Sequence, residues 1–125
     1  MTSPTIDCLC AGIIVSDHVC EPIAYLPKAG ELILTPSTQL AVEWCASNVA
    51  VDLARLNCKA AILGRVGADI FGQHLKQELS RQQVICDHLI ESTTAQTATT
   101  LIVNVKGRGP QVHSCGWSEW GIQRN

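Results

Sequence analysis

Residues 46–56 carry the apolar spacing of an amphipathic helix. Val49, Leu53 and Leu56 fall on one face of a helix drawn over this segment, and charged residues fall on the opposite face. Asn57 follows directly, and asparagine tolerates the left-handed conformation that often ends a helix. We therefore predict a helix over residues 46–56 that ends at Asn57.

A second helix is predicted over residues 70–82. Its apolar side chains recur every four residues, at Phe71, Leu75 and Leu79. Asp69 stands just before this segment, where a short carboxylate can cap the first backbone N–H groups of a helix. The segment therefore has both a start signal and an apolar face.

Two apolar runs of strand length precede the predicted helices. Residues 6–15 show no alternation of apolar and polar positions, which suits a strand that is covered on both faces. Residues 60–63 form a shorter run of the same kind, which ends at Gly64. Alternating strands and helices of this sort are typical of a mostly parallel sheet with right-handed crossovers.

The remaining strand-like segments do not fit that alternation. They are residues 32–35, which Pro36 ends, and residues 99–105 and 111–115, which a turn at residues 106–109 joins. We place the two hairpin-like pieces, near residues 27–36 and 99–115, in a small β-lid beside the sheet. The expected fold is α/β, with a mostly parallel, Rossmann-like sheet, helices and this β-lid.

Composition and charge exclude several classes of protein. Of the 125 residues, 46% are apolar and 16% are charged, which is typical of neither a disordered chain nor a coiled coil. The net charge of −2 leaves no basic stripe for nucleic acid. The apolar run at residues 8–15 is too short to span a membrane, and no positively charged segment precedes it. We expect no nucleic-acid or membrane partner, and a cytoplasmic location.

Seven cysteines are a high count, but their spacing favours neither disulfides nor zinc. The number is odd, the sequence contains no CxxC pair, and only Cys8 and Cys10 are close together. Residues two apart in a strand share a face, so this pair is expected to pack into the core as small hydrophobes. We predict seven reduced, structural thiols and no metal site.

Four short motifs follow one another in the order seen in one family of enzymes. Ala-Gly at residues 11–12 precedes Asp17, which lies five residues after the glycine. The other three are Leu-Pro-Lys-Ala-Gly-Glu at residues 26–31, Cys-Ala-Ser-Asn-Val-Ala at 45–50 and Val-Gly-Ala-Asp-Ile-Phe-Gly at 66–72. Together, over residues 6–113, they resemble the pfkB or ribokinase-like carbohydrate kinases. The resemblance implies a partial ribokinase-like fold, in which residues 1–115 form the amino-terminal substrate and lid part.

The resemblance assigns Asp17 and Asn48 to the hydroxyl groups of a sugar or nucleoside. Short polar side chains in a concave, otherwise apolar site suit such a ligand. We expect Asp17 at the carboxyl end of the first strand, where open α/β sheets bind ligands and a carboxylate can accept hydroxyl hydrogen bonds. Asn48, at the start of the first helix, can both donate and accept. From the residues alone, a solvated loop acid at Asp17 and a helix cap at Asn48 are the alternatives.

Two departures from the family pattern bear on function. The family's Gly-Gly pair before Cys45 is replaced by Glu43 and Trp44, which we expect to fill the space and stiffen the turn that hinges the lid. The family's catalytic motif, Asp-Thr-x-Gly-Ala-Gly-Asp, supplies the anion-holding amides and the base for phosphoryl transfer, and it does not occur in this sequence. We therefore assign no catalytic residue. ATP and Mg²⁺ are implied for a full-length member but not for this chain, in which residues 116–125 form a divergent tail.

The sequence thus predicts a truncated pfkB-type carbohydrate kinase that is inactive by itself. The family activity is ATP-dependent phosphorylation of a sugar or nucleoside hydroxyl. Two alternatives stay open: a non-catalytic module that binds a polyol or pairs with a chain supplying the second half, and a degenerate gene product. The resemblance also raises a homodimer formed through the lid strands.

Overall fold

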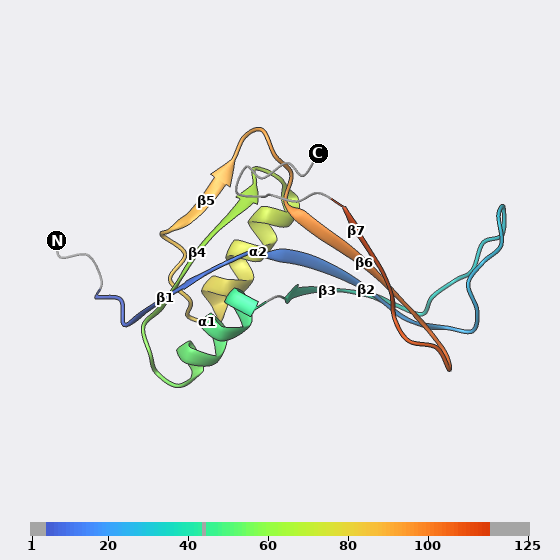
Figure 1. Cartoon of the computed structure of the whole chain (residues 1–125), viewed down its shortest axis with the longest axis horizontal. Coiled ribbons are helices and arrows are strands. Elements are labelled where there is room, and N and C mark those ends of the chain that lie inside the picture. Colours follow the sequence, from blue (N-terminus) through green and yellow to red (C-terminus); the bar gives the residue numbers. More distant parts are fainter. Residues whose placement is uncertain (1–4, 44, 116–125) are drawn as a thin grey trace.

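The computed structural model describes residues 5–43 and 45–115 (Figure 1). Its elements, in chain order, are β1 (Cys8–Ala11), β2 (Val15–Ile23), β3 (Thr38–Glu43), α1 (Cys45–Arg55), β4 (Ala60–Gly67), α2 (Ile70–Arg81), β5 (Leu89–Ser92), β6 (Ala98–Val105) and β7 (Gln111–Cys115). The strands form two sheets, a core sheet of order β1-β4-β5 and a lid sheet of order β3-β2-β6-β7. In Figure 1 the lid sheet extends away from the helices, and the loop between β2 and β3 lies farthest out. The predicted α/β fold with a β-lid is confirmed.

The core sheet is parallel throughout, and α1 and α2 make its two crossovers. Right-handed crossovers that step in one direction, from β1 to β4 to β5, place both helices on the same face of the sheet. The buried side chains on that face are small on α1 and large on α2: Ala46, Ala50 and Ala54, and Leu75 and Leu79. Alanines let α1 lie close to the sheet, and the leucines of α2 fill the remaining volume.

The opposite face of the core sheet carries exposed apolar side chains. Leu9 of β1 is 49% exposed and Ile90 of β5 is 45% exposed, although Ala61, the partner of Leu9, is buried. Strand alternation places these residues away from the helices. Within the described residues, no helix covers this face.

The bounds of both predicted helices are confirmed to within one residue at each end. The predicted apolar face of α1 is wrong, because Val49 and Leu56 are 50% and 76% exposed. Asn57 has a φ of 61°, so it is the left-handed residue that follows α1. Asp69 caps α2, because its Oδ1 accepts a hydrogen bond of 2.8 Å from the Gly72 N–H. The cysteine pair is also placed as expected, with Cys10 buried and Cys8 packed against the same core.

The predicted single strand over residues 6–15 is wrong. The chain leaves the core sheet after Ala11 and enters the lid sheet at Val15, with the fully buried Ile14 between them. Gly12 lies where the chain passes α1, and a Cβ there would sit 2.9 Å from the Cβ of Ala46. An unbroken apolar run cannot reveal this change of sheet, since the apolar residues continue from β1 through the link into β2.

The predicted strand over residues 32–35 is also wrong. Leu32 and Leu34 are 80% and 84% exposed in the loop between β2 and β3. The strand of this region is β3, which pairs antiparallel with β2 from Cys20–Thr38 to Val15–Glu43. The short strand β5 was not predicted, and β4 runs past Gly64 to Gly67.

The centre of the lid sheet joins segments that are far apart in the sequence. β2 and β6 are parallel, and β7 returns antiparallel beside β6 after a turn in which Gly107 has a φ of 73°. The strands predicted over residues 99–105 and 111–115 and the turn between them are therefore confirmed. The lid is a mixed sheet, whereas the core is purely parallel.

Candidate functional site

Asp17 is a buried residue of the lid sheet. It is the third residue of β2, is 6% exposed, and pairs with Ala41 of β3 on one side and Thr100 of β6 on the other. The Thr100 hydroxyl donates a short hydrogen bond to Oδ1 of Asp17. The expected position at the carboxyl end of a core strand is wrong, because the chain has already crossed to the lid. The alternative of a solvated loop acid is wrong as well.

Asn48 lies in the first turn of α1 and is exposed. Its Nδ2 donates a hydrogen bond of 3.2 Å to Oε2 of Glu43, the last residue of β3. Asn48 is the fourth residue of the helix, and its side-chain partner is a carboxylate rather than a backbone N–H. It is therefore not a helix cap. Trp44, the second altered hinge residue, lies outside the described residues.

Glu43 is a neighbour of both predicted sugar ligands. It pairs with Val15, so Glu43 and Asp17 are diagonal partners across β2 and β3. Diagonal residues of an antiparallel pair lie about 7–8 Å apart and project from the same face. The lid-sheet face that carries Asp17 therefore also carries the carboxylate that binds the Asn48 amide.

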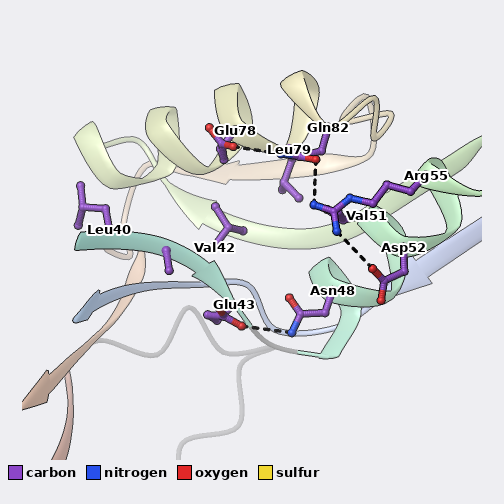
Figure 2. Close-up of a pocket in the computed structure, with 11 residues that line it drawn as sticks. Leu40, Val42, Glu43, Asn48, Val51, Asp52, Arg55, Glu78, Leu79 and Gln82 are labelled. Carbon is purple, nitrogen blue, oxygen red and sulfur yellow. Dashed lines mark hydrogen bonds and ion pairs between the residues drawn. The ribbon is translucent and has the colours of Figure 1, made fainter. Parts of the chain in front are cut away.

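A cleft of about 420 Å³ opens between β3, α1 and α2. Figure 2 shows Leu40 and Val42 projecting toward α2, while the Glu43 and Asn48 side chains meet beside the end of β3. On the far side of the cleft, Arg55 donates a hydrogen bond of 3.3 Å to Gln82, the residue that follows α2. Asp17 does not line this cleft. Of the two predicted sugar ligands, only Asn48 lines it together with Glu43.

The motif at residues 66–72 connects three segments of the chain through hydrogen bonds. Asp69 accepts hydrogen bonds from the N–H and the hydroxyl of Thr97, at 2.8 and 2.6 Å, and the same hydroxyl accepts from the Gly67 N–H at 2.9 Å. A Cβ on Gly72 would collide with the carbonyl oxygen of Gly67. Burial raises the pKa of Asp69, but hydrogen bonds from Thr97, Gly72 and Phe71 outweigh it and leave the pKa below its usual value. The motif ties β4 and α2 to the residue that precedes β6.

The motif at residues 26–31 is a local turn. The Glu31 carboxylate accepts hydrogen bonds from the Tyr25 hydroxyl at 2.6 Å and the Lys28 N–H at 3.0 Å. These two bonds, that of Tyr25 first, hold the pKa of Glu31 below its usual value. Gly30 has a φ of 80°, which glycine adopts without strain. The motif shapes the lid loop and lies away from Asp17 and Asn48 along the chain.

Possible metal ligands are scattered in the described part of the chain. Among residues 5–43 and 45–115, no three His, Cys, Asp or Glu side chains are grouped to hold a metal ion. In the glycine-containing turn after β6, two backbone N–H groups donate to backbone carbonyl oxygens, that of Lys106 to Ile23 and that of Arg108 to Val105.

No helix in the described part of the chain is long and apolar enough to cross a membrane.

Sequence reasoning missed three residues that support the candidate site. Thr97 and Thr100 lie about 30 and 80 residues from the carboxylates they bind, so no local pattern marks them. Ser47, beside Asn48, donates a hydrogen bond of 2.7 Å to the Glu43 carbonyl. The threonine-rich segment at residues 93–100 contains the first two, but its composition alone does not identify their partners.

The two-sheet architecture is the ribokinase-like fold. A ribokinase from Arabidopsis thaliana, described in complex with ribose and ATP, superimposes with a TM-score of 0.80 at 21% identity, over 89% of this chain and 36% of that chain. A nucleoside kinase from Methanocaldococcus jannaschii gives a TM-score of 0.74 at 21% identity, over 87% of this chain and 36% of that one. These likenesses define the fold.

Residues 8–115 match the pfkB family of carbohydrate kinases, and the chain belongs to that family. The ribokinase of Haemophilus influenzae is 31% identical over 88 residues, which are 70% of this chain and 28% of the relative. A fructokinase of Vibrio alginolyticus is 39% identical over 56 residues, 45% of this chain and 18% of the relative. The chain therefore spans less than a third of the length of these curated relatives.

Proposed function

We propose that this chain is the substrate-binding and lid part of a pfkB carbohydrate kinase, with Asp17 and Asn48 as ligands for sugar hydroxyls. The observation that carries the proposal is the buried carboxylate of Asp17 in the middle of the lid sheet. Burying a carboxylate is unfavourable unless it is hydrogen-bonded, and the Thr100 hydroxyl supplies one bond while the other oxygen keeps its acceptor capacity. A sugar hydroxyl is a suitable second donor.

The ligand class follows from the relatives and from the side chains. Proteins named ribokinase and fructokinase are among the relatives, and a solved ribokinase is described with ribose. Carboxylate, amide and hydroxyl groups on one face can accept from and donate to a polyol. Ribose and fructose are therefore the first sugars to test, with nucleosides after them.

We further propose that the 125-residue chain does not transfer phosphate by itself. The sequence lacks the Asp-Thr-x-Gly-Ala-Gly-Asp motif, which in the family supplies the anion-holding amides and the base for phosphoryl transfer. A ribokinase from Cryptococcus neoformans is described in complex with ADP, and this chain covers 35% of that protein. We place the ATP and Mg²⁺ sites, and the catalytic base, in a part of the domain that this chain does not include, with residues 1–115 as the substrate and lid part.

Calorimetric titration of the chain with ribose and fructose tests the binding proposal. Asp17→Asn keeps the size of the side chain and removes the charge, and Asn48→Ala removes the amide. Asp17→Asn should weaken sugar binding about tenfold or more, because a hydrogen bond to a charged group contributes about 1.5–3 kcal/mol. Asn48→Ala should weaken it about twofold to tenfold, because a hydrogen bond between neutral groups contributes about 0.5–1.5 kcal/mol. Asp87→Asn, at an exposed residue before β5 that does not line the cleft, is the matched control. Equal affinity in all four chains would refute the assignment.

The phosphate proposal has its own assay. ATP consumption is measured with a panel of pentoses, hexoses and nucleosides, and no sugar-dependent turnover is expected. Sugar-dependent turnover that Asp17→Asn abolishes would overturn the proposal.

A second candidate, from another class, is a module that pairs with a chain supplying the missing half. The exposed Leu9 and Ile90, on the face of the core sheet that α1 and α2 leave open, favour it. Co-expression with the carboxyl-terminal half of a pfkB kinase tests it. A stable complex, lost in a Leu9→Lys, Ile90→Lys double variant, is the expected result, and absence of any complex rejects this candidate.

A further inference from the structure

The end of β3 is fastened to the first turn of α1 by two hydrogen bonds that differ in kind. One joins the Glu43 carbonyl oxygen to the Ser47 hydroxyl, at 2.7 Å, and any residue at position 43 could make it. The other joins the Glu43 carboxylate to the Asn48 amide, at 3.2 Å, and it needs this side chain. A glycine at position 43 would keep the first bond and lose the second.

The second bond occupies a group that the proposed function needs. An ionised carboxylate only accepts hydrogen bonds, so it satisfies an amide donor as a sugar hydroxyl oxygen would. Hydrogen bonds to ionised acceptors are about twice as strong as those between neutral groups. The Asn48 Nδ2 carries two N–H groups and Glu43 accepts from one of them, so a hydroxyl that accepts from that same N–H must replace a stronger partner.

Glu43 adjoins both proposed sugar ligands. It is the diagonal neighbour of Asp17 on the same sheet face and the direct partner of Asn48. A ligand that contacts both Asp17 and Asn48 therefore lies beside the Glu43 carboxylate. The exposed side chains of Glu43 and Asn48 leave room for the two to separate.

We propose that Glu43 is an intramolecular competitor of the sugar, which holds one N–H of the Asn48 amide in the free chain and must release it before a hydroxyl can accept from that N–H. The inference rests on the sugar-binding role proposed above for Asn48. Glu43 thereby sets the affinity of the site without being one of its ligands.

The test is sugar titration of the unmodified chain and of Glu43→Ala. The substitution should tighten the Kd for ribose or fructose between about twofold and tenfold, the range expected when one competing hydrogen bond is removed. Glu43→Gln keeps an acceptor oxygen but no charge, so its Kd should lie between those of the other two chains. An unchanged or weaker Kd in Glu43→Ala overturns the inference.

Glu21→Ala is the matched control. Glu21 is also a lid carboxylate of β2 with one side-chain hydrogen bond, from the Ser37 hydroxyl at 2.7 Å, but it does not contact Asn48. Its removal should leave the Kd unchanged. An equal gain in Glu21→Ala would mean that general lid charge, not competition for Asn48, sets the affinity, and would overturn the inference.

The ¹⁵N-detected NMR signal of the Asn48 side-chain amide separates the two proposals. It should shift in Glu43→Ala and stay in place in Glu21→Ala, in the absence of sugar, and dispersed backbone signals verify that each variant is folded. Sugar binding with an unmoved Asn48 signal overturns the inference alone. Absence of sugar binding in every chain overturns the proposed function, and the competition falls with it.

Discussion

Asp69 and Thr97 are joined by two hydrogen bonds, from the Thr97 N–H at 2.8 Å and from its hydroxyl at 2.6 Å. The hydroxyl in turn accepts from the buried Gly67 N–H at 2.9 Å. One threonine thus binds the capping carboxylate of α2 and accepts a hydrogen bond from the last N–H of β4. Because Thr97 directly precedes β6, these bonds also hold the start of β6 in place. The relationship links the core sheet to the lid sheet through side chains rather than strand pairing.

Thr97→Val should destabilise the fold by about 1–3 kcal/mol. The valine is similar in shape, but it leaves the Gly67 N–H buried without its partner and removes a donor to Asp69. Thr93→Val, an exposed threonine of the same loop, is the control and should change the free energy of unfolding by less than about 0.5 kcal/mol. Urea unfolding measures both, and equal effects would contradict a special role for Thr97.

The pH dependence of stability should carry the signature of Asp69. Its folded pKa is lowered, so its stabilising contribution is complete above the unfolded value, about 3.9, and is lost as the pH falls through the folded pKa. Asp69→Asn should therefore be less stable than the unmodified chain at pH 7, and the difference should shrink below about pH 4. Urea unfolding at a series of pH values from 7 to 2.5 checks this. A difference that stays constant with pH would contradict it.

Gly72→Ala should be among the most damaging single changes in α2. Its Cβ would collide with the backbone carbonyl oxygen of Gly67, and no side-chain rotation can relieve the contact, because the position of a Cβ is fixed by the backbone. We expect a loss of about 3 kcal/mol, the upper part of the range for overpacking. Gly109→Ala is the control, because nothing lies within 4 Å of a Cβ there. Thermal unfolding with equal midpoints for the two variants would refute the collision.

Local signals predicted the helices well and the strands less well. The two helices, the Asp69 cap and the left-handed Asn57 follow from spacing and from single residues at helix ends, which act over a few positions. The break between β1 and β2 depends on which sheet each half joins, and no residue of the run from 6 to 15 encodes that choice locally. For the same reason β3 was placed too early, since its register is set by β2 and not by its own composition.

The candidate site shows the same division. Asp17 and Asn48 could be singled out from motifs, but the partners that decide their state could not. Thr100 reaches Asp17 only because β6 pairs with β2, and Glu43 reaches Asn48 only because β3 leads directly into α1. The replacement of Gly-Gly at positions 43 and 44 was visible in the sequence, whereas the hydrogen bond that Glu43 makes was not.

All seven cysteines are predicted to be free thiols, and their rates of reaction should differ. Cys8, Cys10, Cys20, Cys45, Cys58 and Cys86 are free in the described part of the chain. Cys45 is exposed, whereas burial raises the pKa of the Cys10 and Cys86 thiols and slows thiolate formation. Ellman's reagent should modify Cys45 first in the native chain and count seven thiols after denaturation without reductant. A count of five or fewer would mean a disulfide.

The isolated chain is predicted to self-associate through its lid. Leu32 and Leu34 are 80% and 84% exposed, and each apolar side chain left in water forgoes about 1.5–3 kcal/mol of burial. Light scattering after size exclusion should report dimers or larger species, which Leu32→Ser with Leu34→Ser shifts toward monomer. Leu56→Ser, at the end of α1 and outside the lid, should have no such effect. A monomer across micromolar concentrations would contradict the prediction.

The parallel pairing of β2 with β6 also has a consequence for the order of folding. Asp17 and its partner Thr100 are 83 residues apart, so their contact closes a long loop. Closing the loop lowers the conformational entropy of the chain, and this loss slows formation of the contact. During synthesis, β1, α1 and β4 are complete before β6 exists. In a nascent chain that has formed β1, α1 and β4, strands β2 and β3 can therefore pair only with each other. Asp17 lacks its partner on β6, and stays exposed to water, until translation has passed the end of β6.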